Sequence, residues 1–317
     1  MKKHGMNKKQ AEKILATAVM GMNLVNTVAP LAVLATAEQK LSVVPQPVRS
    51  EAEPLDYAVL PQLADVVDRA IFARAYATDY DGNASVADMV NGDKQTITAG
   101  QNGIVSTMSD GFQEIDSGGI GTVSTMSRGS QIISGGMGTV ITMSSGVQTI
   151  YSGGTGAITM MSDGWQEISG GTGTVSTLNG GRQNAYSGGN ATASTMMNGI
   201  QTVKEDAMGT VSTMSGGQQS ISSGGTGIVS TMSGGEQSIS SGGTGTVDIM
   251  SGGSQTIVSG AAGTINTMHD GMQAISSGCT GTVSAMNGGT QAVNSGGTAL
   301  DTVIAGGTQL VSVGAVI

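Results

Sequence analysis

A glutamine recurs at a nearly constant interval from Gln95 to Gln309 of this 317-residue chain. Ten of the twelve spacings are 18 residues and two are 17. A short fixed period is the signature of repeat architectures, in which each unit buries its apolar face against its neighbours. The chain is therefore expected to fold as a stack of similar units. The recurring glutamines are Gln95, Gln113, Gln131, Gln148, Gln166, Gln183, Gln201, Gln219, Gln237, Gln255, Gln273, Gln291 and Gln309.

Each repeat has two short apolar stretches separated by glycine-rich turns. With the glutamine as position 1, position 3 is usually Ile, positions 6 and 7 Gly-Gly, position 11 Val and position 14 Met. The copy that begins at Gln219 shows this with Ile221, Val229 and Met232. Ile, Val and Thr are typical of strands, and paired glycines within every few residues exclude a helix. Each unit is therefore strand, turn, strand, turn.

Stacked units of this kind predict an all-β fold, a parallel β-helix (β-solenoid) of 18-residue coils. Coils spaced at about 4.8 Å would make a rod of roughly 60 Å. The glutamine column is expected to form an amide ladder, as stacked glutamines do in cross-β assemblies. The residue missing from each 17-residue copy lies next to Gly-Gly, which places it in a turn. The inward core ladder is predicted to be Ile115, Ile133, Ile150, Ile168, Ile221, Ile239, Ile257 and Ile275.

The valine at position 11 and the methionine at position 14 are an odd number of residues apart. Successive side chains of a flat strand alternate between its two faces, so both cannot point inward from one such strand. A bend or bulge between them would turn both toward the core. The sequence leaves this choice open.

Composition limits the partners of such a rod. Charged residues are 11% and aromatic residues 3% of the chain, and the formal net charge is −9. Without residues 1–37 the net charge becomes −13, which makes nucleic acid a poor partner. The single cysteine, Cys279, rules out an internal disulfide and stands where a turn usually has its second glycine.

The region before the repeats divides in two. Residues 1–37 have a basic start, an apolar stretch and a small-x-small end at Ala37, so they predict a cleaved signal peptide. Residues 38–91 are predicted to be a linker with a short N-terminal helical segment at about 61–76, where apolar residues fall on one face. Residues 92–317 are the β-solenoid repeat domain.

The sequence does not support several kinds of chemistry. Calcium-binding nonapeptide repeats need an Asp where Gly242–Met250 has Val247. The carboxylates Asp110, Asp163 and Asp270 occupy one turn position in separate coils, and His269 lacks partners for a catalytic site. We therefore expect no enzyme, no metal and no cofactor. Phe112 and Trp165 share position 18 and, with Tyr151, suggest a small aromatic patch on an outer face.

The phrases SGGTG-V-S-TM-SGG-Q-I and GGTALDTVIAGGTQLVSVG, the latter at Gly296 to Gly314, resemble the passenger repeats of AIDA-type autotransporter adhesins. The resemblance covers roughly residues 92–317. It implies a right-handed β-helix on the bacterial cell surface or outer membrane, or released outside the cell. It also implies O-glycosylation of turn serines by a glycosyltransferase. The matching residues are Ser117, Ser152, Ser187, Ser223, Ser241, Ser277 and Ser295.

Two departures from this family affect the expected export route. Position 14 is Met rather than the family's usual Val, and the repeats run to Ile317 without the C-terminal β-barrel of autotransporters. A truncated reading frame or a separate exporter would account for that. The leading hypothesis is a surface or secreted passenger for cell adhesion or self-association (autoaggregation), whose partners are host or bacterial cell surfaces or other copies. A structural spacer without binding activity and a glycan-cleaving β-helix enzyme are the alternatives.

Overall fold

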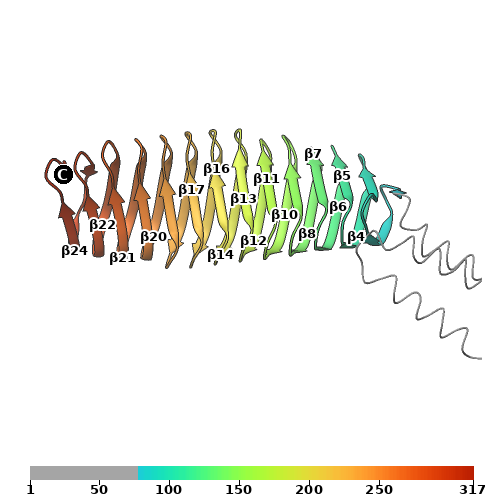
Figure 1. Ribbon diagram of the computed structural model, residues 1–317, viewed down its shortest axis with the longest axis horizontal. Coiled ribbons are helices and arrows are strands. Elements are labelled where there is room, and N and C mark those ends of the chain that lie inside the picture. The colour runs from blue at the N-terminus through green and yellow to red at the C-terminus, as the bar shows by residue number, and fades with distance from the viewer. Residues whose placement is uncertain (1–77) are drawn as a thin grey trace, which may run out of the picture. The chain divides into compact units, whose positions relative to one another are not determined.

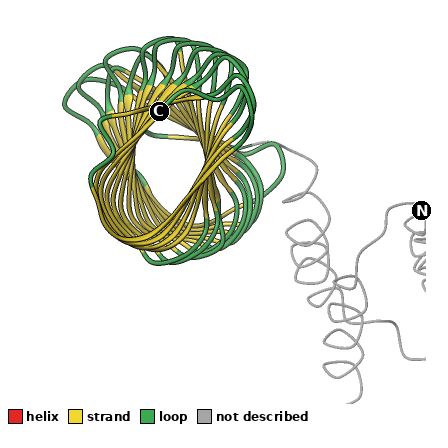
Figure 2. Ribbon diagram, turned by 90° about the vertical axis from the view of Figure 1, so that its left-hand side faces the viewer, coloured by secondary structure: helices red, strands yellow, loops and turns green. Residues whose placement is uncertain are grey.

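The computed structural model describes residues 78–317, which form an all-β parallel β-solenoid of about thirteen coils. The repeat predicted this fold and its 18-residue coils, and both are confirmed. Figure 1 shows the coils following one another along a rod, from β4 to β24, and Figure 2 shows them superposed as a ring down the axis. No helix lies in this part of the chain. The predicted signal segment 1–37, Ala37 and the predicted helix at 61–76 lie outside the described residues.

Each coil contributes one short and one long strand, and some coils run the two together. The short strands are β1 (Asp79–Tyr80), β3 (Lys94–Ile97), β5 (Phe112–Asp116), β7 (Ser130–Ser134), β9 (Val147–Ile150), β11 (Trp165–Ser169), β13 (Arg182–Tyr186), β15 (Ile200–Val203), β17 (Gln218–Ile221) and β19 (Glu236–Ile239). The long strands are β2 (Ser85–Met89), β4 (Asn102–Met108), β6 (Ile120–Met126), β8 (Met137–Met143), β10 (Thr155–Met161), β12 (Thr172–Leu178), β14 (Asn190–Met196), β16 (Met208–Met214) and β18 (Thr226–Met232). The remaining strands are β20 (Thr244–Ile257), β21 (Ala262–Ile275), β22 (Thr280–Val293), β23 (Thr298–Leu300) and β24 (Ile304–Val311).

Every strand pairs in parallel with its counterpart in a neighbouring coil. Gln219 lies opposite Gln237, and Ile221 lies opposite Ile239. The pairing also survives the 17-residue copies, since Gly121 lies opposite Gly138 after the first deletion. A deletion inside a strand would have moved every later side chain to the other face. The missing residue is therefore in the turn, as the sequence indicated.

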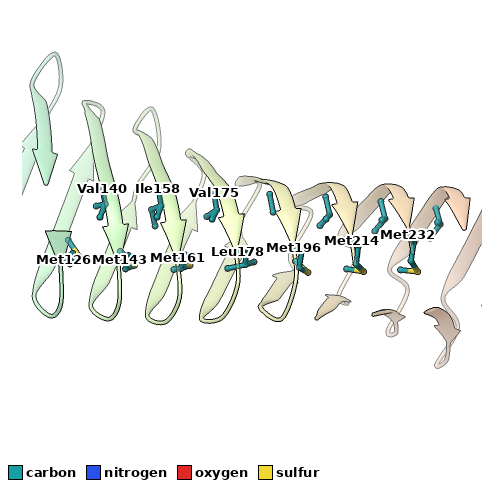
Figure 3. Close-up of a cluster of buried hydrophobic side chains, with 14 of the residues drawn as sticks. Met126, Val140, Met143, Ile158, Met161, Val175, Leu178, Met196, Met214 and Met232 are labelled. Atoms are coloured by element: carbon teal, nitrogen blue, oxygen red, sulfur yellow. The ribbon is translucent and has the colours of Figure 1, made fainter. Parts of the chain in front are cut away.

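The inward side chains form two apolar columns. One consists mainly of the position 3 isoleucines; Ile115, Ile133, Ile150, Ile168, Ile221, Ile239, Ile257 and Ile275 are all buried. The other combines the valines and methionines of positions 11 and 14. In the long strands the ladder skips position 12: Val211 pairs with Val229, and the next pair is Thr213 with Thr231. This local break turns both residues inward, and Figure 3 shows Val140 with Met143 and Val175 with Leu178 on the same side.

The glutamines form a continuous amide ladder inside the rod. In each of the twelve links, the Nε2 of one glutamine donates to the Oε1 of the glutamine one coil earlier, at 2.6 to 2.9 Å. Most of these Nε2 groups also lie near a backbone carbonyl; that of Gln219 lies 3.2 Å from Gly209 O. No buried side-chain N or O atom of the described residues lacks a partner. The ladder therefore satisfies a column of amides buried in an apolar core.

Glycine at position 9 makes room for the isoleucine at position 3. A Cβ at Gly173 would lie 2.3 Å from Cδ1 of Ile168, and one at Gly189, position 7 of the next coil, would lie 2.9 Å from its Cγ2. Where position 3 is instead Ala185, both facing positions are alanine, Ala191 and Ala207, and all three are buried. Methyl groups at the two facing sites thus occupy part of the volume lost at Ala185. Position 7 also accepts Ala261 and Cys279 beside full isoleucines, so the methyl group of Ala191 at position 9 is the more specific of the two changes.

The solenoid extends further toward the N-terminus than the glutamine repeat. β1 pairs with β3 and β2 pairs with β4, so residues 79–91 form one more coil within the segment that the sequence assigned to a linker. This coil has no glutamine, but Val86 and Met89 keep the spacing of the valine and methionine columns and are buried. Gln95 donates to the carbonyl oxygens of Asp81 and Ala84, at 3.0 Å each, so this coil closes that end of the ladder.

The last coil leaves its inward positions uncovered. Ile304 at position 14 and Val311 at position 3 are 47% and 44% exposed, whereas their equivalents one coil earlier, Met286 and Val293, are buried. Gln309 donates to Gln291 at 2.7 Å, and its own side chain is half-buried. The last coil therefore differs from the coils before it, in which the same inward positions are buried.

Substituting a glutamine of the ladder tests how much the ladder stabilises the rod. Gln219→Met keeps the side-chain length but removes the bonds to Gln201 and Gln237, which leaves a buried acceptor and a buried donor. At about 1–3 kcal/mol for each unpaired group, we expect the free energy of unfolding to fall by about 2–6 kcal/mol. Denaturant unfolding measures this. The control is Gln309→Met at the half-buried end, which loses one bond; equal effects at both sites would contradict the interpretation.

A second substitution tests the volume exchange around Ala185. Ala185→Ile alone should destabilise the protein by about 1–3 kcal/mol, because its added atoms meet the methyl groups of Ala191 and Ala207. Adding Ala191→Gly and Ala207→Gly restores the pattern of the other coils and should recover most of that loss. Thermal and denaturant midpoints of the single and triple variants give the comparison. A single variant as stable as the parent would show that the three alanines are not coupled.

Candidate functional site

The outer faces carry repeated hydroxyl groups. On the long strands, Thr174, Thr192 and Thr210 lie opposite one another in successive coils at position 10. Thr195, Thr213 and Thr231 do the same at position 13. Since neighbouring coils are about 4.8 Å apart, these columns present a hydroxyl at most steps along the rod. Ala157 and Ile228 interrupt the first column, and Met160 and Ile249 interrupt the second.

The turn after the short strand carries a second repeated feature. The seven predicted glycosylation sites, Ser117, Ser152, Ser187, Ser223, Ser241, Ser277 and Ser295, are all exposed and all occupy position 5 of their coils. The structure thus brings them to one edge of the rod and leaves their side chains accessible. O-glycosylation stays a prediction, which the intact mass of the exported chain would test.

One part of the short-strand face differs from the rest. We call it the Trp165 patch. Its core is two paired strands, β11 and β13, in which Trp165 lies opposite Arg182, Glu167 opposite Asn184, and Ser169 opposite Tyr186. Glu205, in the turn after β15, adjoins it. The patch consists of Trp165, Glu167, Arg182, Asn184, Tyr186 and Glu205.

Hydrogen bonds and charges connect the members of the Trp165 patch. Asn184 is 7% exposed and its Nδ2 donates to Glu167 Oε1 at 2.7 Å. The Oγ of Ser187 donates to Glu205 Oε2 at 3.1 Å. Burial raises the pKa of the Tyr186 phenol above its usual value, and the carboxylates of Glu167 and Glu205 raise that pKa further, while Arg182 acts in the opposite direction. The phenol therefore lies within the field of all three charged groups.

The turn beside the patch has the backbone conformation of the neighbouring turns but carries different residues. Glu205 and Asp206 have φ values of 54° and 62°, in the left-handed region. Asp206 stands at position 6, where neighbouring coils have Gly188 and Gly224. Asp tolerates this region better than most residues, although the conformation still costs about 1 kcal/mol or more. This coil thus has a carboxylate at the edge of the patch, at a position where the neighbouring coils have glycine.

The other residues considered from the sequence have local structural roles. Asp110, Asp163 and Asp270 each accept a hydrogen bond from the N–H of the glycine that follows, at 2.9, 2.7 and 2.7 Å, and they lie in separate coils. His269 is exposed, and Cys279 is buried at position 7, facing the isoleucine column. Within residues 78–317 no group of three His, Cys, Asp or Glu side chains could hold a metal ion. No helix of this region is long and apolar enough to span a membrane.

Comparison with known proteins gives no relative: no family model, no curated protein and no solved structure matches the chain.

The predicted aromatic patch is only partly assembled. Phe112 and Trp165 share position 18, as the numbering indicated, but β7 and β9 lie between their strands. The two rings are therefore three coil steps apart, or roughly 14 Å. Sequence reasoning did not single out Glu167, Asn184 and Tyr186. The repeat numbering contained the signal, because it assigns them to outward positions 2 and 4 of consecutive coils beside Trp165.

The raised pKa of Tyr186 makes stability depend on alkaline pH. The folded state holds this proton more tightly than the unfolded chain, whose pKa is near 10.0. The stabilisation is present below that pH and is lost as pH rises through the folded-state pKa. Glu167→Gln should lower the pKa, though only in part, because burial is the larger cause. Phenolate absorbance, with Tyr186→Phe to isolate this group, measures it; an unchanged titration would contradict the proximity of Glu167.

Proposed function

We propose that the chain is a surface-exposed or secreted passenger that mediates cell adhesion or self-association. The observation that supports this most directly is the repetition of outward hydroxyl columns along a continuous core. Each contact made by such a column is weak. Contacts held at a fixed spacing on one rod add by multivalency, because each one formed raises the effective concentration for the next.

The polar character of the rod fits partners at cell surfaces. Beyond residue 101 the only basic residues are Arg128, Arg182 and Lys204, so an anionic polymer such as nucleic acid is disfavoured. Carbohydrate coats and other copies of the chain offer neutral hydroxyl and amide groups that Ser, Thr and Asn can bind. We infer that host or bacterial surfaces, or a second copy, are the partners.

Export and modification belong to the same proposal. A signal peptide at residues 1–37 with cleavage after Ala37 would bring the chain out of the cell, to the bacterial surface or outer membrane or into the medium. The resemblance to AIDA-type autotransporter passengers supports this location, right-handed winding of the coils and a helix at about 61–76. Exposure of the position 5 serines gives a glycosyltransferase the access that it would need.

A structural spacer is the second candidate. The unbroken glutamine ladder favours it, since a uniform core yields a stiff rod without any requirement for binding. The two functions differ in what the outer surface does. A spacer depends on its length, whereas an adhesive rod depends on the number of binding columns that it presents.

Deletion of whole coils distinguishes these functions. Removing residues 219–236, 219–254 or 219–272 joins equivalent positions of two coils and keeps the register. Because multivalent contacts multiply, we expect autoaggregation of displaying cells, or light scattering by the purified chain, to fall steeply with each coil lost. Circular dichroism of each variant verifies the strand content. Association that is absent, or independent of coil number, would contradict the adhesive role and leave the spacer.

A further inference from the structure

We propose that the Trp165 patch is a binding site for a neutral oligosaccharide, a segment of two or three sugar units that lies across β11 and β13. This proposal rests on the adhesive function and gives it a ligand class and a place. It depends on features of a few coils rather than on the repeated columns, and so it can fail independently of them.

The first argument is that departures from the repeat gather here. Two of the three basic residues beyond residue 101, Arg182 and Lys204, lie in these coils, and so does the only tryptophan of the chain. The core substitution Ala185 and the left-handed residue Asp206 occur in the same stretch. At position 2, which Glu167 and Asn184 occupy, the next coils toward the C-terminus carry the small residues Thr202, Ser220, Ser238 and Thr256.

The second argument is the chemistry of the side chains. Trp165 is 44% exposed, so part of a large flat indole is available to stack on the C–H face of a sugar ring. Arg182 lies opposite Trp165 in the next coil, and its guanidinium forms no ion pair with any residue in the described part of the chain. Its planar set of N–H donors suits adjacent sugar hydroxyls. Saccharides need this combination of an apolar platform and planar polar groups.

Glu167 and Asn184 supply the polar centre of the site. Their mutual hydrogen bond, at 2.7 Å, fixes both side chains in place before a ligand arrives. The carboxylate keeps acceptor capacity beyond this one bond, and the amide keeps a carbonyl acceptor. Groups held in advance lose less conformational entropy on binding. The pair is therefore suited to accept hydrogen bonds from sugar hydroxyls.

The dimensions of the face match a short sugar chain. The strand β11 has five residues, Trp165 to Ser169, and the four steps between them span about 13 Å, while the next coil lies about 4.8 Å away. Tyr186 lies opposite Ser169 at the far end of the strand, and Tyr151 occupies the same position one coil before Ser169, two coils before Tyr186. Aromatic side chains thus stand at both ends, with the Glu167–Asn184 pair between them.

Charge decides between neutral and acidic ligands. Glu167 and Glu205 both contribute to the raised pKa of Tyr186, so two carboxylates act on the same phenol. Asp206 in the adjoining turn is a third carboxylate. These three negative charges exceed the two positive charges of Arg182 and Lys204. An acidic sugar would bring a further negative charge next to these carboxylates, which costs binding energy. A neutral saccharide avoids this repulsion.

Tryptophan fluorescence provides a direct test, because Trp165 is the only tryptophan in the protein. The full chain is titrated with chitotriose, cellotriose and maltotriose, and with a sialylated trisaccharide as the acidic probe. We expect saturable quenching or a spectral shift with at least one neutral trisaccharide, and weaker binding of the acidic probe. No change with any neutral trisaccharide at millimolar concentration, in fluorescence and calorimetry alike, would overturn the proposal. Preference for the acidic probe would overturn the neutral class.

Matched variants locate the site. Trp165→Ala and Glu167→Gln should each weaken the calorimetric affinity by about tenfold. The control is Phe112→Ala, at the same position of an earlier coil and 46% exposed. There the neighbouring Lys94 is engaged by Glu114 at 2.8 Å, and Phe112→Ala should leave the affinity unchanged. Equal weakening by Phe112→Ala and Trp165→Ala would exclude a site at the patch.

The two proposals are separable in one further variant. Deleting residues 219–254 removes two coils but none of the patch residues. Retained trisaccharide binding in this variant is expected. If the deletion variant binds the trisaccharide with unchanged affinity while aggregation does not depend on coil number, the adhesive role of the hydroxyl columns is contradicted. The saccharide site at the Trp165 patch is then retained. Loss of binding in this variant, with strand content preserved, would count against a site confined to β11 and β13.

Discussion

The inward glutamine ladder is the interaction on which the register of the whole rod depends. A column of apolar side chains is indifferent to small displacements along the axis, whereas an amide must meet its neighbour at hydrogen-bonding distance and orientation. Each glutamine from Gln95 to Gln291 is both donor and acceptor, and Gln309 at the end of the chain of bonds donates to Gln291. A slip of one residue would leave buried donors and acceptors unpaired, at a cost far above that of a shifted apolar contact. The ladder therefore determines which residues of neighbouring coils lie opposite each other. The outward hydroxyl columns have the same register.

The same constraint explains what the sequence was able to predict. The period, the turn deletions, the isoleucine column and the amide ladder all follow from spacing, because stacking converts a sequence interval into contact in space. The inward orientation of both Val229 and Met232 did not follow. It depends on a local break in pairing at position 12, and neither side-chain type nor spacing distinguishes a flat strand from a strand with such a break. The coil at residues 79–91 was missed because it lacks the glutamine and the paired glycines, although Val86 and Met89 keep the spacing.

The candidate site was harder to predict for a different reason. A repeat defines the usual residue type at each position. A functional site is expected where the residue differs from that usual type. Trp165 was visible as such a departure, but Glu167, Asn184 and Tyr186 are unremarkable residue types one at a time. Only the parallel pairing of β11 with β13 makes them neighbours. Their significance is a property of two consecutive coils together, and a residue-by-residue reading of one sequence does not reveal it.

The core beneath the Trp165 patch contains matched substitutions, which indicates that these coils accommodate residues that differ from the repeat. Ala185 removes most of an isoleucine from the column, and Ala191 and Ala207 refill part of that space from two different coils. Alanine in place of isoleucine at position 185, without other changes, would have left a cavity. The resulting loss of stability increases with the volume of the cavity. The matched changes leave the ladder intact through the patch, since Gln183 and Gln201 keep bonds of 2.7 and 2.8 Å. A rigid backbone under β11 and β13 then holds the indole, the guanidinium and the Glu167–Asn184 pair at fixed separations, which is the condition for a weak ligand to be bound selectively.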